Sequence, residues 1–347
     1  MRILHVMAGA REGGAENIML ESVLALQEVE TITQCVVTRP ENTFRLRAFE
    51  QAGIDVHTAS FNKMFKGPTR RVLDRAIRDF QPDIIQYWMG RAGQFAPARY
   101  RDISIGWYGG YYKLERFRNC LWHIGLTKDL VRHIREQGVP YEHIGLIHTT
   151  ADFKGARSVD RASLDTPADA PVALALARLH VKKGLDTLLE AATKLPELYV
   201  WIAGDGPLES ELKAQCSALG LDGRVRFLGW RNDRDALLAA CTLVAFPSRY
   251  EPFGTVTVDA WAAGKPLVAA DAVGPAAYVK DGINGLLIPK NDADALAAAM
   301  KRILDNPDLA HSLVKGGYDT FNKTFTKQAF QQDSLAFYRK IRQHVSS

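Results

Sequence analysis

Two acidic residues stand in one short stretch of the chain, SRYEPFGTVTVDAWAAGKPLVAA, residues 248–270. Glu251 falls where Pro and Gly predict a loop, and Asp259 falls in the apolar segment after it, which predicts a helix beginning near Thr255. Amides in the first turn of a helix can bind phosphate oxygens, and carboxylates accept hydrogen bonds from hydroxyl groups. The stretch therefore suits a ligand with hydroxyl groups at both ends and phosphates between them, as in a nucleotide sugar. The alternative is a capped helix whose two acids face solvent.

A cationic turn, ARLHVKKGLD, follows another apolar run. Arg178 and Lys183 flank the end of a predicted strand, and Gly184 opens a predicted helix. Two cations beside a helix N-terminus are favourable when an anion binds between them, and a diphosphate would satisfy both. The alternative is that both side chains are solvated, as most Lys and Arg are.

Two further turns are rich in glycine. In AGDGPLES, Gly204 and Gly206 lie between a predicted strand and a helix, where a ligand could approach the backbone closely. In AGAREGGAEN, Gly13 and Gly14 precede a helix whose amides could meet an anion. Each could equally be a plain turn. The spacing is not the GxGxxG of a dinucleotide fingerprint, which argues against an NAD-dependent oxidoreductase.

The elements that must position these turns alternate between strand and helix along the chain. Apolar runs such as 3–7, 84–88, 172–177 and 243–248 are separated by segments of helical period, a βαβα order that implies parallel sheets covered on both faces. Residues 154–170 are polar, without apolar period, and predict a linker. We therefore expect an α/β protein of two Rossmann-like, doubly wound domains that face each other across a cleft.

The predicted domain boundaries follow from that linker. The first domain covers residues 1–155 together with a C-terminal helix at about 328–347, and the second covers residues 170–327. A helical pattern from about 319 to 344 is expected to cross back to the first domain. Ligands of open parallel sheets bind at the carboxyl ends of the strands, so the turns described above should line the cleft.

Composition narrows the class of protein. The chain has 347 residues, 47% hydrophobic and 24% charged, with a net charge of +5. No apolar run approaches the roughly 20 residues that span a bilayer, and the short apolar start reads as a first strand rather than a secretion signal. Four cysteines without metal spacing read as reduced thiols, which favours a cytoplasmic protein. The mild positive charge suits a phosphate-bearing ligand but does not argue for nucleic acid.

Taken in order, the motifs GGAEN, ARLHVKKG, AGDGP, FLGW, FPSRYEPFGTVTVDAWAAGKPLVA and DGINGLLIP resemble those of GT-B glycosyltransferases of family 4, which are retaining and use nucleotide sugars. The resemblance spans almost the whole chain and is strongest over residues 172–289. It implies a first domain that binds the acceptor and a second that binds the donor. It also implies that no cofactor or metal is needed, with a UDP-sugar favoured over a GDP- or ADP-sugar.

The resemblance also implies roles for single residues. The residues expected to act in catalysis bind the donor sugar and the leaving diphosphate: Glu251, Arg178 and Lys183. The residues expected to hold the remaining donor are Gly13, Gly14, Gly204, Trp230, Arg231, Phe253, Gly254, Thr255 and Asp259. Among them Phe253, Gly254 and Thr255 would act through backbone amides, and Asp259 would hold the ribose.

Two positions depart from the family pattern. Asp259 stands where the second Glu of an E-x7-E motif is usual, and we expect the shorter carboxylate to keep its contact with the ribose hydroxyls. Tyr108 stands where many relatives have a histidine near the donor sugar. Tyrosine is a poor base at neutral pH, but the reaction class is not expected to depend on a strong base.

The sequence contains fewer signals for the acceptor site than for the donor site. Trp88 and Arg91 follow a predicted strand and are expected, with Tyr108, on the acceptor side, where a phosphorylated glycolipid is one candidate. Residues 61–80 and 111–122 are basic with aromatic residues between, and could dock on anionic lipid or form solvated faces. A peripheral place at the inner face of the cytoplasmic membrane is therefore one expectation.

The function that follows is a retaining glycosyltransferase. It would move a hexose from a nucleotide-diphospho-sugar to a saccharide or glycolipid acceptor, in the synthesis of bacterial cell-surface polysaccharide or lipopolysaccharide. Two alternatives stay open: a nucleotide-sugar binding protein without turnover, and a GT-B nucleotide-sugar epimerase that would form product without any acceptor.

Overall fold

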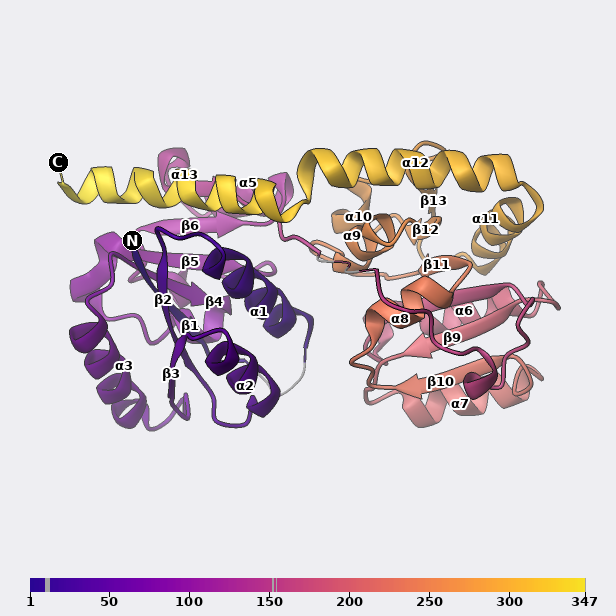
Figure 1. Ribbon diagram of the computed structural model, residues 1–347, viewed down its shortest axis with the longest axis horizontal. Helices are drawn as coiled ribbons and strands as arrows, with labels where there is room; N and C mark the ends of the chain where they lie inside the picture. Colours follow the sequence, from indigo (N-terminus) through magenta and orange to yellow (C-terminus); the bar gives the residue numbers. More distant parts are fainter. Residues whose placement is uncertain (10–12, 152, 154, 347) are drawn as a thin grey trace. The chain divides into compact units, whose positions relative to one another are not determined.

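The computed structural model describes residues 1–9, 13–151, 153 and 155–346. Its internal contacts divide the chain into two compact units. One comprises Met1–Thr150 and Phe325–Ser347, and the other Ala151–Thr324. Each unit is a parallel sheet with helices, as the alternating pattern predicts (Figure 1).

The sheet of the first unit has seven strands in the order β3-β2-β1-β4-β5-β6-β7, and all its pairs are parallel. The central strands are buried along their whole length because helices cover the sheet, which explains their continuous apolar sequence. The strands are β1 (Arg2–Met7), β2 (Thr33–Thr38), β3 (Asp55–Thr58), β4 (Ile84–Trp88), β5 (Ser104–Tyr108), β6 (Trp122–Gly125) and β7 (Ile144–Leu146).

Along the sequence, the helices of the first unit alternate with its strands, except for the last helix, which follows the second unit. They are α1 (Gly14–Gln27), α2 (Thr43–Gln51), α3 (Lys66–Phe80), α4 (Met89–Gly93), α5 (Lys128–Glu136) and α13 (Lys327–Ser346), with 3₁₀ turns at Ala98–Ile103, Leu114–Phe117 and Tyr141–His143.

The C-terminal helix α13 belongs to the first unit, which confirms the predicted crossing back. Gln331 donates to the carbonyl of Ala25 at 2.7 Å, and the hydroxyl of Tyr338 donates to Gln86 in β4 at 2.8 Å. The predicted C-terminal helix at about 328–347 is confirmed as α13, and the helical pattern from about 319 to 344 covers parts of two helices. That region holds the end of one helix and most of another, because α12 stops at Thr324 and α13 begins at Lys327.

The second unit has six parallel strands in the order β10-β9-β8-β11-β12-β13. Its strands are β8 (Val172–Leu176), β9 (Tyr199–Ala203), β10 (Val225–Gly229), β11 (Leu243–Phe246), β12 (Leu267–Ala270) and β13 (Leu286–Ile288). Its helices are α6 (Leu185–Ala192), α7 (Glu209–Ala218), α8 (Arg234–Ala240), α9 (Thr255–Ala262), α10 (Val273–Ala276), α11 (Ala293–Asp305) and α12 (Pro307–Thr324), with 3₁₀ turns at Ala162–Leu164 and Val181–Lys183.

Residues 155–170 belong to the second unit and are not the free linker that their polar composition predicts. The guanidinium of Arg161 donates to the carbonyls of Ala240, Ala168 and Ala170 at 2.6–3.1 Å. These hydrogen bonds, rather than apolar packing, hold the polar segment against the second unit. The units therefore divide at Thr150, a few residues before the expected boundary.

Two general features complete the fold. Among the described residues, no helix is both long enough and apolar enough to cross a membrane. The four cysteines are free thiols and all are buried in the cores.

Candidate active site

The loops after β8 and β11 are bound to each other, because these strands are neighbours in the second sheet. The amides of Arg249 and Tyr250 both donate to the carbonyl of Lys182, at 2.8 and 3.2 Å. Gly184 has a left-handed φ of 64°, and a Cβ there would overlap the carbonyl oxygen of Pro247. Glycine at this position therefore allows the two loops to touch.

The contact between these loops brings Lys183 and Glu251 together. The ammonium of Lys183 donates to the carboxylate of Glu251 in a direct ion pair, and their side chains are 25% and 16% exposed. The pair is thus held at a surface where a ligand can reach both charges. An ammonium can bind phosphate oxygens and a carboxylate can accept hydrogen bonds from hydroxyls, so the pair can contact a molecule that carries both groups. Arg178, on the same loop as Lys183, is exposed.

The N-terminus of α9 lies directly after Glu251. Gly254 caps the helix with a φ of 92°, and Thr255 is its first residue. The first amides of a helix have no partner within it, so those of α9 can donate to an anion. The side chain of Phe253 is only 3% exposed and packs on Tyr278, which leaves its backbone as the part that could meet a ligand.

Asp259 lies in α9 and is 4% exposed. Burial raises the pKa of its carboxyl group, and the opposing attraction comes from Arg234 at the start of α8, whose Nη1 lies 3.3 Å from Oδ1. The ion pair with Arg234 therefore offsets part of the cost of burying this acid. Sequence reasoning missed Arg234, because no motif marks a partner that comes from another helix.

The turns after β9 and β10 lie beside the turn after β8. A Cβ on Gly204 would overlap the carbonyl of Ala177, and the amide of Gly204 donates to the carbonyl of Gly229 at 2.7 Å. The residues that follow Gly229 are the predicted contacts of the base. Trp230 is 39% exposed, and Arg231 forms a two-point ion pair with Asp233. The carboxyl ends of β8, β9, β10 and β11 thus carry all the predicted residues of this unit.

Gly13 and Gly14 lie in the first unit, at the N-terminus of α1. A Cβ on Gly9 or Gly13 would overlap the carboxylate of Glu16, which is itself 5% exposed. The chain therefore places its own carboxylate against these glycines. A phosphate there would have to share the place with Glu16, which sequence reasoning did not foresee. Residues 10–12 of the predicted turn lie outside the described residues.

Trp88 and Tyr108 are core residues, which corrects their predicted place on the acceptor side. Trp88 is 1% exposed and donates from its indole to His5 at 3.2 Å. Tyr108 is fully buried against Phe117 and His123, and its hydroxyl has no hydrogen-bond partner among the described residues. Trp88 is the last residue of β4 and Tyr108 the last residue of β5, and both strands lie near the centre of the sheet. Because helices cover the two faces of the sheet there, both side chains turn inward.

Arg91 is the one predicted acceptor-side residue that is partly open to solvent. It lies in α4, directly after β4, and its Nη2 donates to the carbonyl of Phe61 at 3.1 Å. It thus lies at the carboxyl end of the first sheet, where α/β proteins bind ligands.

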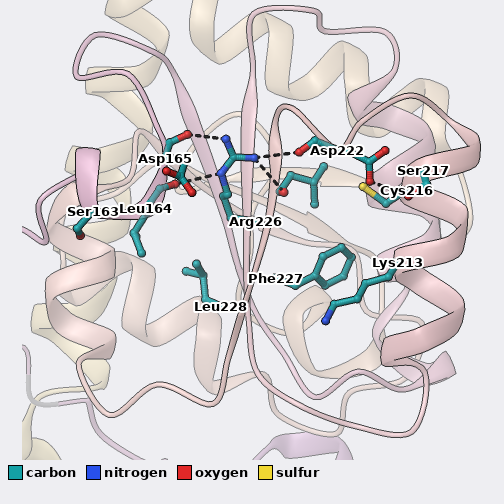
Figure 2. Close-up of a pocket in the computed structure, with 11 residues that line it drawn as sticks. Ser163, Leu164, Asp165, Lys213, Cys216, Ser217, Asp222, Arg226, Phe227 and Leu228 are labelled. Carbon is teal, nitrogen blue, oxygen red and sulfur yellow. Dashed lines mark hydrogen bonds between the residues drawn. The ribbon is translucent and has the colours of Figure 1, made fainter.

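A cavity of about 820 Å³ lies at the β10 edge of the second unit and involves none of the predicted residues (Figure 2). Arg226 crosses it and donates to the backbone carbonyls of Leu164, Asp165 and Asp222 (Figure 2). Because carbonyl oxygens already take up its N–H groups, Arg226 stabilises this edge rather than offering a charge to a ligand.

Comparisons with known proteins identify the family of the chain. Residues 156–320 match the model of the family described as glycosyl transferases group 1. The chain is 32% identical to the lipopolysaccharide core biosynthesis glycosyltransferase LpsE of Rhizobium meliloti (strain 1021), over 95% of this chain and 96% of that protein. It is also 32% identical to LpsD of the same organism, over 97% and 98% of the two chains.

Solved structures show the same fold. The structure of Anabaena Alr3699/HepE in complex with UDP and glucose matches with a TM-score of 0.82 at 22% identity, over 97% of this chain and 98% of that one. The sucrose-phosphate synthase of Thermosynechococcus elongatus matches with a TM-score of 0.81 at 20% identity, over the whole of both chains. With two parallel α/β units, a C-terminal helix that returns to the first, and relatives over its full length, the chain belongs to the group 1 glycosyltransferases of the GT-B fold.

Proposed function

We propose that the protein is a retaining hexosyltransferase that takes its sugar from a nucleoside diphosphate. The observation that carries this proposal is the joining of Lys183 and Glu251 by the loops after β8 and β11. Glu251 would accept hydrogen bonds from the hydroxyls of the donor sugar. Lys183 and Arg178, with the amides of α9, would stabilise the charge that develops on the departing phosphate.

The rest of the donor site follows from the same edge of the second sheet. Asp259 would hold the ribose, with Arg234 as its ion-pair partner, and the backbone at Trp230 and Arg231 would contact the base. This positive field needs no metal ion, so we propose a metal-independent reaction that EDTA leaves unchanged.

UDP-hexose is the proposed donor. HepE, which shares this fold, has been crystallised with UDP and with UDP-glucose. For the acceptor we propose a saccharide of the lipopolysaccharide core, since the relatives that match along the whole chain are core biosynthesis glycosyltransferases. The second unit would bind the donor and the first unit the acceptor.

A panel of UDP-, GDP- and ADP-glucose in a thermal-shift assay tests the donor, since a ligand that binds only the folded state raises its melting temperature. We expect a rise with the UDP-sugar and UDP release when a core oligosaccharide is added. Binding without release, even with acceptor, would indicate a protein that only binds nucleotide sugars. A changed sugar nucleotide without acceptor would indicate an epimerase.

We further propose that the enzyme works in the cytoplasm, against the inner face of the membrane. The outer face of α3 carries exposed basic residues, and Met64 and Phe65 before it are 86% and 69% exposed. Cations beside exposed apolar side chains suit a surface of anionic lipid. Phe61, in contrast, is buried and takes no part. Flotation with vesicles of phosphatidylglycerol, compared with phosphatidylcholine, tests this: equal flotation with both would contradict it.

A further inference from the structure

Two arginines flank the end of the central strand β1 in the first unit. Arg39 directly follows β2, and Arg91 lies in α4 after β4, while β2 and β4 are the neighbours of β1 on its two sides. Both therefore lie at the carboxyl edge of the sheet, where parallel sheets bind ligands. Neither belongs to the donor residues, all but two of which lie in the second unit.

The backbone that holds Arg91 is unusual at two places. Met89, two residues before it, has a φ of 66°, and Phe61, whose carbonyl accepts from Arg91, has a φ of 49°. These are left-handed conformations that residues with bulky side chains rarely adopt, and such strain persists only where the surroundings enforce it. Strain of this kind gathers at binding sites, so its presence on both sides of one arginine points to a ligand at that arginine.

Polar atoms at this edge are incompletely paired. The Nε atoms of Arg39 and Arg91 and the Oδ1 of Asn42 are buried, and none has a hydrogen-bond partner among the described residues. Asn42, directly before α2, is 2% exposed and uses only its amide nitrogen, which donates to Thr38 at 2.9 Å. Buried polar atoms without partners call for an explanation, and a ligand that draws the side chains toward itself would supply one.

The charge at this edge is positive. Arg39 pairs with Glu41 at 2.9 Å, while Arg91, among the residues that the structure describes, donates to the carbonyl of Phe61. The hydrogen bond from its own backbone amide lowers the pKa of Glu41 first, and the attraction of Arg39 and Arg91 lowers it further. Lys66 adds a third cation: its Nζ lies 5.9 Å from the ring of Phe95, which packs edge-on against Phe61.

We propose that Arg39 and Arg91 form a subsite for a phosphate monoester on the saccharide acceptor. Two guanidinium groups that follow different strands can donate to different oxygens of one phosphate, which carries more negative charge and more acceptor oxygens than a carboxylate. Asn42 would accept a hydrogen bond from a neighbouring hydroxyl of the sugar. The inference rests on the proposed function, since it names the class of acceptor that the first unit would take.

Calorimetric titration of two forms of one oligosaccharide tests the subsite. The probe is a lipopolysaccharide core oligosaccharide, used as isolated with its phosphates and after their removal by hydrofluoric acid, with UDP in excess so that the donor site is filled. We expect the phosphorylated form to bind at least about tenfold more tightly, as loss of a charged hydrogen bond commonly gives. Equal affinity of the two forms, or binding of neither, would overturn the proposal.

Variants make the test specific to the two arginines. In Arg39→Ala and in Arg91→Lys, the preference for the phosphorylated form should fall to about threefold or less. Arg101→Ala removes the same charge from an exposed position before β5, and it should keep the full preference. A preference unchanged in both arginine variants would also overturn the proposal.

Two features of the design keep the outcomes separate. The preference is a ratio measured within one variant, so a general loss of stability does not imitate the effect. The melting-temperature rise with UDP-glucose reports on the donor site in the second unit independently. If UDP-glucose does not raise the melting temperature, the proposed function is contradicted. If UDP-glucose raises it but the phosphorylated oligosaccharide is not preferred, only the proposed subsite is contradicted.

Discussion

The two sheets of this protein share the order of their first six strands but differ in the residues at their carboxyl edges. In the second unit, the loops after β8 and β11 touch, and charged side chains such as Lys183 and Glu251 meet between them. In the first unit, aromatic residues take the corresponding places. Trp88 and Tyr108 end their strands fully enclosed, and His5 lies below them in a buried hydrogen-bonded network with Gln34.

This difference teaches which part of the fold determines chemistry. A parallel sheet brings loops to one edge, but only the backbone of those loops decides whether side chains face outward. Glycines with left-handed φ at 184 and 254 allow the second unit to open its edge to charged groups. The first unit packs its edge as core and leaves Arg39 and Arg91 at the surface. The proposed donor residues thus gather at the edge of the second sheet, while the first sheet offers only the two arginines of the proposed acceptor subsite.

Replacing Glu251, at the edge of the second sheet, should reduce turnover more than any other substitution considered for the two edges. In Glu251→Gln we expect turnover, measured as acceptor-dependent UDP release, to fall about 100- to 1,000-fold, as when a group that stabilises a transition state is removed. Stability should change by less than about 1 kcal/mol, since the ion pair with Lys183 is partly exposed.

The matched control for this prediction is Glu209→Gln. Glu209 also pairs with a lysine, Lys213, but on the exposed face of α7. Turnover should stay at the wild-type value in this variant. A similar loss in both variants, or in neither, would remove Glu251 from its assigned role.

Substituting Gly184 should break the contact between the two loops. A Cβ there would overlap the carbonyl of Pro247, so Gly184→Ala must displace the loop that carries Glu251. We expect the affinity for UDP-glucose, measured by calorimetry, to fall about tenfold or more. Gly220→Ala is the control, because Gly220 has nearly the same φ, 69° against 64°, but has no atom near its Cβ position. It should lose about 1 kcal/mol of stability and no affinity.

The same contrast shows how far sequence reasoning reaches. Glu251, Gly254 and Lys183 lie at the turns where the sequence predicts them, because the neighbours of each specify the turn, while their roles in binding stay predictions. Tyr108 is misplaced because alternation along a strand does not tell whether its last side chain turns inward. Arg234 is missed for another reason: it meets Asp259 only through the packing of two helices.

The fold itself is largely predictable, since the apolar runs and their order determine two parallel sheets. The exception is the polar segment 155–170, which joins the second unit through Arg161. Arg161 donates to the carbonyl of Ala240, and Arg226 donates to the carbonyls of Leu164 and Asp165 in the segment. Hydrogen bonds between residues so far apart in the sequence leave no mark in local composition.

Low pH should destabilise the protein through two buried histidines of the first unit, His5 and His123. Burial lowers the pKa of His5 to about 4 and that of His123 to about 3, against about 6.5 in an unfolded chain. Below pH 6.5 the unfolded state therefore binds protons that the folded state does not, and stability falls with the pH. Each histidine should lower the free energy of unfolding by about 1.2 kcal/mol between pH 6 and 5.

The measurement is a pH titration of the imidazole signals by nuclear magnetic resonance, with urea unfolding at each pH. Two rings should stay neutral at pH 5. The control is His311→Gln, which replaces an exposed histidine of the second unit and should leave the fall in stability unchanged. Rings that all titrate near pH 6.5 would show that the network around His5 opens readily.

Removing the hydroxyl of Tyr108 should change turnover least. It therefore tests whether this residue belongs to the core or to the active site. The hydroxyl is buried without a partner among the described residues, and burial raises its pKa, so it is neither a base nor an anchor. In Tyr108→Phe we expect turnover within about twofold of wild type. The melting temperature should be unchanged or raised by about 2–4 °C, since a buried polar atom without a partner is lost. A loss of turnover above tenfold in a variant of wild-type stability would mean that this hydroxyl reaches the substrate, and that the edge of the first sheet opens during the reaction.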